Sequence, residues 1–304
     1  MAETTTIEWT DSTWNPWQGC TKVSLGCDNC YAETLTKRWG RTFTTLRRSA
    51  DATFYAPLSP RWRTPRLVFT CSLSDFFHRQ ADPWREEAWD IMRRTPHLTY
   101  QVLTKRPGLA VAWYKNHGWL PNVWLGAAVE NQKYAPRLDV LARVPAPVRF
   151  VSVEPMMGPV DLGRWLMRYG LGYAREAGLG ANLAGFTGVP TRWVICGGES
   201  GRGARPMHPD WARSLRDQCQ AAGVPFFFKQ WGAWLPDDHC TDDQWHGARE
   251  RYGREFIHDR LGEGPAALSV SIVQRWAFVG KKAAGALLDG REWREMPLSH
   301  GSIP

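Results

Sequence analysis

The sequence has no long apolar run and no leader-like start. No stretch of about 18 or more consecutive apolar residues occurs, so a membrane-spanning helix is not expected. The first residues, MAETTTIEW, lack the charged and then apolar pattern of a secretory signal peptide. We therefore expect a soluble, cytoplasmic protein without a membrane partner.

Cysteine is also scarce, with seven in 304 residues, an odd number that does not suit a secreted disulfide framework. Three of them, Cys20, Cys27 and Cys30, fall within eleven residues. In a reducing cytosol such a group indicates a metal site. The other four are scattered and are expected to be small buried hydrophobic residues: Cys71, Cys196, Cys219 and Cys240.

Acidic residues are outnumbered by basic ones, which gives a net charge of +8 and a pI of about 9.3. The chain also has 18 Trp residues, more than a core of this size requires. Together these features fit a polyanionic partner, DNA or RNA, although many basic proteins bind no nucleic acid.

Short β-rich runs alternate with helical stretches, a pattern that predicts parallel strands joined by crossovers. The predicted strands are Ile7–Trp9, Leu67–Cys71, Tyr100–Leu103, Val123–Ala127, Arg149–Val153, Trp193–Cys196 and Pro225–Phe228. The predicted helices are Cys30–Trp39, Pro83–Arg94, Gly108–Asn116, Lys133–Arg143 and Pro209–Ala222. The fold class is therefore α/β, with a full or partial parallel TIM-like barrel.

Two segments interrupt this rhythm and read as inserted loops or lids, residues 41–66 and the glycine-rich residues 162–190. The parallel pattern ends at Gly232. We thus expect a barrel over residues 1–232 and a polar, Trp-bearing C-terminal extension, residues 233–304, packed on it.

Polar residues follow almost every predicted strand. In a parallel barrel the carboxyl ends of all strands lie on one face, so these side chains should converge on one cavity, where barrel enzymes keep their chemistry. The alternative is that strands end at the surface, where residues are polar anyway. The set comprises Ser72, Ser74, Asp75, Lys105, Arg106, Glu130, Glu154, Gly197, Gly198, Glu199 and Lys229.

Three carboxylates in this set, Glu130, Glu154 and Glu199, would share one pocket. Like charges drawn together must either pair with the cations of the same set or bind a cationic ligand. An active site and a purely structural group of ion pairs both remain open at this point.

The three cysteines form a C-x6-C-x2-C motif that runs from the first predicted strand into the first helix. Three thiolates can bind three irons of a four-iron cluster and leave the fourth iron open. A structural zinc ion normally has four ligands, and the nearest His is His78. Zinc with a distant fourth ligand, or three unligated thiols, are the alternatives.

Long motifs place the chain near a known family: IEWTDSTWNPWQGC, GCDNCYAE, SLSDFFH, LTKRP, WLGAAVENQ, FVSVEPMMGPV, ICGGESGRGARPM, FFFKQWG and VGKKAAGALLDGREW. The chain resembles the three-Cys-motif phage proteins, a family of unassigned function found in phages and bacterial genomes. That family is regarded as similar to radical S-adenosylmethionine enzymes. The resemblance implies a [4Fe-4S] cluster on Cys20, Cys27 and Cys30, and S-adenosylmethionine as cofactor.

The resemblance also implies roles for the polar set. Radical enzymes usually have an aromatic residue just before the last cysteine; here Asn29 stands there and Tyr31 comes one place after Cys30. Ser72, Ser74 and Asp75 would receive the methionine amino group. The remaining cofactor groups would contact Lys105 or Arg106, Glu130, Gly197 and Gly198.

Glu154, Glu199 and Lys229 would then face the substrate as catalytic residues. The leading hypothesis is a radical enzyme acting on a nucleic acid or a nucleotide base, by modification or by repair similar to that of photoproduct lyases. The alternative is a non-catalytic nucleic-acid-binding protein whose cysteines hold a structural zinc ion.

Overall fold

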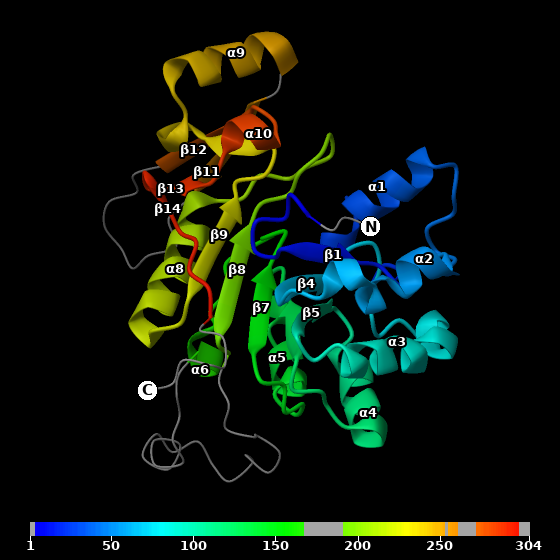
Figure 1. Cartoon of the computed structure of the whole chain (residues 1–304). Coiled ribbons are helices and arrows are strands. Elements are labelled where there is room, and N and C mark those ends of the chain that lie inside the picture. The colour runs from blue at the N-terminus through cyan, green and yellow to red at the C-terminus, as the bar shows by residue number, and fades with distance from the viewer. Residues whose placement is uncertain (1–3, 167–190, 253–254, 261–271, 298–304) are drawn as a thin grey trace, which may run out of the picture.

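A computed structural model describes residues 4–166, 191–252, 255–260 and 272–297 (Figure 1). Its centre is a seven-stranded parallel sheet whose strands lie side by side in chain order. The strands are β1 (Ser12–Trp14), β4 (Arg66–Thr70), β5 (Leu98–Thr104), β6 (Val123–Ala128), β7 (Arg149–Val153), β8 (Trp193–Gly197) and β9 (Phe226–Gln230). The predicted parallel α/β architecture is confirmed.

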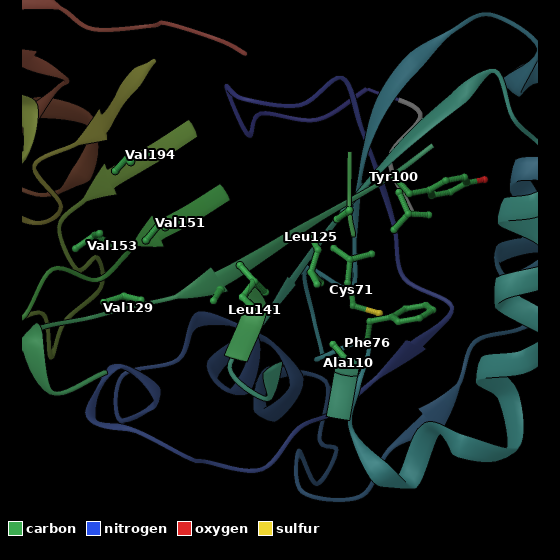
Figure 2. Close-up of a cluster of buried hydrophobic side chains, with 14 of the residues drawn as sticks. Cys71, Phe76, Tyr100, Ala110, Leu125, Val129, Leu141, Val151, Val153 and Val194 are labelled. Atoms are coloured by element: carbon green, nitrogen blue, oxygen red, sulfur yellow. The ribbon is translucent and has the colours of Figure 1, made fainter. Parts of the chain in front are cut away.

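The crossover helices cover the outer face of the sheet. They are α3 (Asp82–Arg94), α4 (Pro107–His117), α5 (Arg137–Leu141) and α8 (Pro209–Ala222). In α3 a proline stands in the first turn, and Arg85, Ala88, Trp89 and Met92 are buried at the spacing of one helix face. Figure 2 shows part of this core, to which strand residues such as Val151 and helix residues such as Leu141 both belong.

The inner face of the curled sheet carries a second core made largely of aromatic rings. Alternate strand residues point to the same face, and here they are Phe69, Trp124, Phe150, Trp193 and Phe227, joined by Trp9 from the N-terminal segment. The Phe150 and Trp193 ring centroids lie 5.7 Å apart. Towards the carboxyl ends of the strands, two or more residues further along, the same face becomes polar. We call the layer of rings beneath these ends the aromatic floor.

The sheet is a curled half-barrel and not a closed barrel. β1 and β9 are its two edges, and no pairing joins them within the described residues. Beside β9, the Phe228 amide donates to the Trp293 carbonyl (2.9 Å), and Arg294 pairs with Glu8 at 2.8 Å. Chain segments from both termini therefore lie along the open side where further strands of a closed barrel would stand.

The predicted strand at Ile7–Trp9 is wrong, because the first strand begins at Ser12. The alternation of Ile7, Glu8 and Trp9 resembles a strand. However, Trp9 instead packs on the inner face of the sheet against Phe69, with ring centroids 4.5 Å apart. The predicted helix at Lys133–Arg143 is shorter than expected, since only Arg137–Leu141 is α-helical.

The remaining segments form small elements. Residues 41–66 hold β3 (Arg47–Arg48), which pairs with β2 (Trp17–Gln18), and α2 (Asp51–Phe54). The predicted loop 162–190 contains α6 (Gly163–Leu166), and residues 167–190 lie outside the described residues. The C-terminal part contains β10 (Trp234–Pro236), β11 (Glu255–Arg260), β12 (Ile272–Phe278), β13 (Leu287–Leu288), β14 (Arg291–Glu292), α9 (Asp242–Tyr252) and α10 (Lys281–Ala284). Among the helices described, none is both long and apolar enough to cross a bilayer.

Most of the tryptophans lie in the core and do not form a surface. Twelve of the 18 are buried and five are half-buried, which leaves Trp39 as the one exposed Trp. The expectation of a Trp-rich surface is therefore wrong. The high count is instead explained by a half-barrel that needs large rings on both faces of its sheet.

Gly126 tests the aromatic floor, because it lies beside Phe150 in the sheet register. A Cβ atom at Gly126 would lie 2.3 Å from the Phe150 ring. We expect Gly126→Ala to lower the free energy of unfolding by about 1–3 kcal/mol, as overpacked cores do. Denaturant unfolding measures it. Gly108→Ala, where a Cβ would meet nothing within 4 Å, should leave stability unchanged or slightly raised; equal effects of both substitutions would contradict this packing.

Candidate functional site

The three cysteines lie on one loop that crosses the carboxyl end of the half-barrel. We call residues 19–30 the cysteine loop; it leads into α1 (Tyr31–Arg38). Its first residue, Gly19, has φ +104°, and a Cβ there would lie 2.9 Å from the Phe43 carbonyl, so the chain requires glycine. All three thiols are half-buried and free.

The loop start is bonded to the segment that follows β4. The Gly19 amide donates to the Leu73 carbonyl at 3.1 Å, and the Ser74 hydroxyl donates to the Gly19 carbonyl at 2.5 Å. At the loop end, the Tyr31 hydroxyl donates to the Ser72 carbonyl. The predicted Ser72, Ser74 and Tyr31 therefore do lie together, and their contacts fasten the loop.

Asp75 and Arg106 form the first of three ion-pair networks that contact the loop. Arg106 pairs with buried Asp75 at 2.9 Å, and it donates to the Thr21 carbonyl at 2.8 Å. The same guanidinium lies 3.6 Å from the Cys20 sulfur. Burial, with the charge of Asp75, raises the pKa of the Cys20 thiol to about 11, and Arg106 opposes that rise.

Asp75 has no acceptor site left for a ligand. Its carboxylate accepts from the Phe77 and Lys105 amides and from the Thr104 hydroxyl, in addition to Arg106. A carboxylate offers about four lone-pair positions. These donors take them all, so Asp75 positions Arg106 and the loop.

Glu130 is the centre of the second network and is fully buried. It pairs with Lys105 and, at 2.8 Å, with Arg137, and it accepts the Ser24 hydroxyl of the loop at 2.5 Å. Burial alone would raise the pKa of the Glu130 carboxyl, but Lys105, Ser24 and Arg137 together lower it. A Cβ at Gly26 would lie 2.6 Å from Glu130, so the loop backbone rests directly on this side chain.

Glu199 and Arg205 form the third network. Arg205 contacts both oxygens of Glu199, at 2.9 and 2.7 Å, and donates to the Leu25 carbonyl at 2.9 Å. Asn29 of the loop donates to Glu199 at 3.0 Å and to the Gly203 carbonyl at 2.7 Å. Glu199, expected to face a substrate, is therefore bonded to the cysteine loop.

Of the predicted pair Gly197 and Gly198, Gly198 has a packing role, whereas a Cβ at Gly197 would make only ordinary contacts, 3.5 Å from Glu154. A Cβ at Gly198 would lie 1.8 Å from the Trp231 carbonyl oxygen, and Gly232 opposite it has φ +94°. The Gly198 amide donates to the Gln230 carbonyl at 2.9 Å. Glycine is needed here because the chain after β8 passes directly against the chain after β9.

Glu154 and Lys229 are the predicted pair that none of the described hydrogen bonds connects to the loop. They pair with each other at 2.5 Å, and their side chains remain 21% and 18% exposed. By strand alternation both point to the inner face, above the aromatic floor. Although Tyr31 as a whole is exposed, its hydroxyl is enclosed; burial first, then the charges of Cys30 and Glu154, raise its pKa. Glu154 thus lies close to the end of the loop.

The three thiols of the cysteine loop are suitable ligands for a metal cofactor, and the Arg106 guanidinium lies beside one of them, Cys20. Burial also raises the pKa of Cys30, so loss of both thiol protons would have to accompany binding. His78 is engaged, since one ring nitrogen contacts the Thr21 hydroxyl and the other accepts the Gln80 amide. Within the described residues, no three His, Cys, Asp or Glu side chains are grouped as ligands of a single ion.

Sequence reasoning brought the right strand ends together but missed several partners. Arg205, Arg137 and Ser24 complete the networks and were not singled out, and Asn29 was named only for its position before the last cysteine, not as a partner of Glu199. Arg205 stands six residues after Glu199 in the ICGGESGRGARPM motif, so a search for cations near each carboxylate would have found it.

The comparisons with known proteins show the family and nothing beyond it. The comparison with curated proteins finds no match, and neither does the comparison with solved structures. A sequence model of the family described as "protein of unknown function (DUF5131)" matches residues 4–297, nearly the whole chain. The expectation of a family without an assigned function is therefore confirmed, and the chain belongs to the DUF5131 family of proteins of unknown function.

Proposed function

We propose that this protein is a radical S-adenosylmethionine-type enzyme that holds an iron–sulfur cluster on Cys20, Cys27 and Cys30. One observation carries the proposal: three buried carboxylates at strand ends fasten a loop with three free thiols across the carboxyl end of a parallel half-barrel. Barrel enzymes keep their chemistry at that end. A loop held this firmly is suited to present ligands to a cofactor.

The ligand inventory favours a cluster over a structural zinc ion. Zinc in a structural site needs a fourth ligand, and His78, the nearest His along the sequence, has both ring nitrogens engaged. A four-iron cluster needs only the three thiolates, each on a separate iron, and keeps one iron open. Ligands of such a cluster need not converge on a single point as those of one ion do.

The predicted site residues at the carboxyl end of the half-barrel, which we call the mouth, would divide into two groups. Asp75, Glu130 and Glu199 position the loop through their cations. Glu154 and Lys229 lie above the aromatic floor with partly exposed side chains, so they are placed to bind a ligand. When bound, the cluster and S-adenosylmethionine would supply the radical, and the chain would supply orientation and exclusion of water.

We propose a nucleic acid or nucleotide base as the substrate. The net charge of +8 supports a polyanion. The reaction would be base modification or repair similar to that of photoproduct lyases.

Replacing any of Cys20, Cys27 or Cys30 with Ala should abolish iron binding, because three thiolates are the minimum that holds the cluster. Anaerobic reconstitution followed by iron, sulfide and zinc analysis and a visible spectrum measures this. Cys240→Ala, a half-buried cysteine outside the loop, is the matched control and should keep full iron content. A colourless protein with one zinc ion, or full iron in Cys27→Ala, would refute the proposal.

Arg205→Ala should loosen the cysteine loop, because it leaves buried Glu199 without its cation and removes the bond to Leu25. Charged hydrogen bonds of this kind contribute about 1.5–3 kcal/mol, so amide exchange over residues 20–30 should accelerate roughly 10- to 150-fold. Hydrogen exchange measures this, and loss of iron to a chelator should accelerate in parallel. Arg213→Ala removes a comparable cation, paired with Asp238 and Asp289, and should leave the loop unchanged. If Arg205→Ala exchanged like Arg213→Ala, the network would not hold the loop.

A further inference from the structure

Exposed large apolar side chains gather on the cysteine loop and α1. Five such side chains are exposed within the described residues, and four of them lie between positions 23 and 39. They are Val23 (42%), Leu25 (50%), Tyr31 (55%) and Trp39 (46%). Exposed apolar groups concentrated in this way, and rimmed by polar residues, mark an interaction surface.

Cations are exposed on the same segment. Lys37, Arg38 and Arg41 are exposed at the end of α1, and Arg41 lies 6.0 Å from the centre of the Trp39 ring. Glu33 pairs with Lys37 at 2.8 Å. Neither Arg38 nor Arg41 has a carboxylate within ion-pair distance among the described residues, so their charge remains available to a ligand.

We infer that this surface, which we call the α1 rim, binds single-stranded nucleic acid. It is defined by Leu25, Tyr31, Trp39, Lys37, Arg38 and Arg41. An exposed Trp stacks on an unpaired base regardless of sequence, while neighbouring Arg side chains neutralise phosphates. A duplex hides its base faces, so the aromatic part of the rim has a role only with an unpaired strand.

The position of the α1 rim links it to the thiols. α1 starts one residue after Cys30, and its eight residues span about 12 Å, a length that fits a few nucleotides. Tyr31, at the near end, donates its hydroxyl toward the mouth, while Trp39 stands at the far end. A strand bound along α1 would therefore pass the cysteine loop. This inference rests on the proposed function and names the surface that receives its substrate.

The surface favours a polyanion over an acidic protein. The rim combines aromatic rings with Arg side chains, and Arg41 lies over Trp39, which suits a polymer that offers both bases and phosphates. If the wild-type protein showed no salt-dependent binding of an oligonucleotide, a protein partner would be favoured and the inference would be overturned.

The test measures binding of a labelled single-stranded oligonucleotide by fluorescence anisotropy at several salt concentrations. Trp39→Ala should weaken affinity about 5- to 150-fold, the loss typical of one stacked base, and Trp39→Phe should keep most of it. Arg38→Glu with Arg41→Glu should weaken binding further and lower the salt slope by about 0.7 for each lost phosphate contact. Wild-type protein should prefer the single strand over the matching duplex.

The control carries the same change of charge on another face. Lys115 and Arg143 are exposed where the helices after β5 and β6 end, at the opposite end of the sheet, and Lys115→Glu with Arg143→Glu should bind like wild type. Undetectable wild-type binding at about 50 mM salt, or equal losses in the rim and control variants, would overturn the inference.

Iron analysis of the same samples separates this inference from the proposed function. Rim variants should keep wild-type iron content, because no rim residue is a proposed ligand. If the rim variants lost binding in a protein that held no iron, the rim would stand and the radical chemistry would fall. If iron were bound but the rim variants bound the oligonucleotide like wild type, the cluster would stand and the role of the rim would fall.

Discussion

The site depends on the need to pair buried carboxylates. Asp75, Glu130 and Glu199 are 4%, 0% and 6% exposed, and an unpaired charge at such depth would be strongly destabilising. The chain gives each carboxylate an Arg or Lys partner, and side chains of all three networks also contact the cysteine loop. The loop is thus held by the same bonds that make burial of these charges possible.

This arrangement requires an apolar layer beneath it. The rings of Phe69, Trp124, Phe150, Trp193 and Phe227 fill the inner face of the half-barrel, which keeps water out from below and leaves the polar residues only the carboxyl end. Because side chains alternate along a strand, one sequence period places Phe227 in this floor and Lys229 above it. The aromatic floor and the polar mouth are therefore successive layers on the same inner face of the half-barrel.

Much of this was predictable, for reasons that depend on local pattern. The strands around Val151 and Val194 were found because buried parallel strands are nearly continuous apolar runs, and strand ends converge in any parallel sheet. Choices between competing partners were not predictable. Arg205 stands only six residues after Glu199, but the sequence does not say whether Glu199 pairs with it or faces a substrate. Likewise, nothing local to Trp9 says that it packs against the inner face of the sheet instead of joining the sheet as a strand. The Trp count misled for the same reason, since composition does not distinguish a ring on the surface from one in the core.

Some charged side chains of the mouth are fully paired within the chain and others are not, and this difference indicates how the mouth would work. Charges that hold the loop are saturated with partners from the chain, as the set of donors around Asp75 shows most fully. Glu154 and Lys229 have only each other within the described residues and keep exposed atoms, and the cations of the α1 rim lie outside the mouth. A polyanion would therefore meet unpaired Arg side chains first and the Glu154–Lys229 pair last. A ligand that entered the mouth would therefore meet an ion pair that it could separate without breaking the networks that hold the cysteine loop.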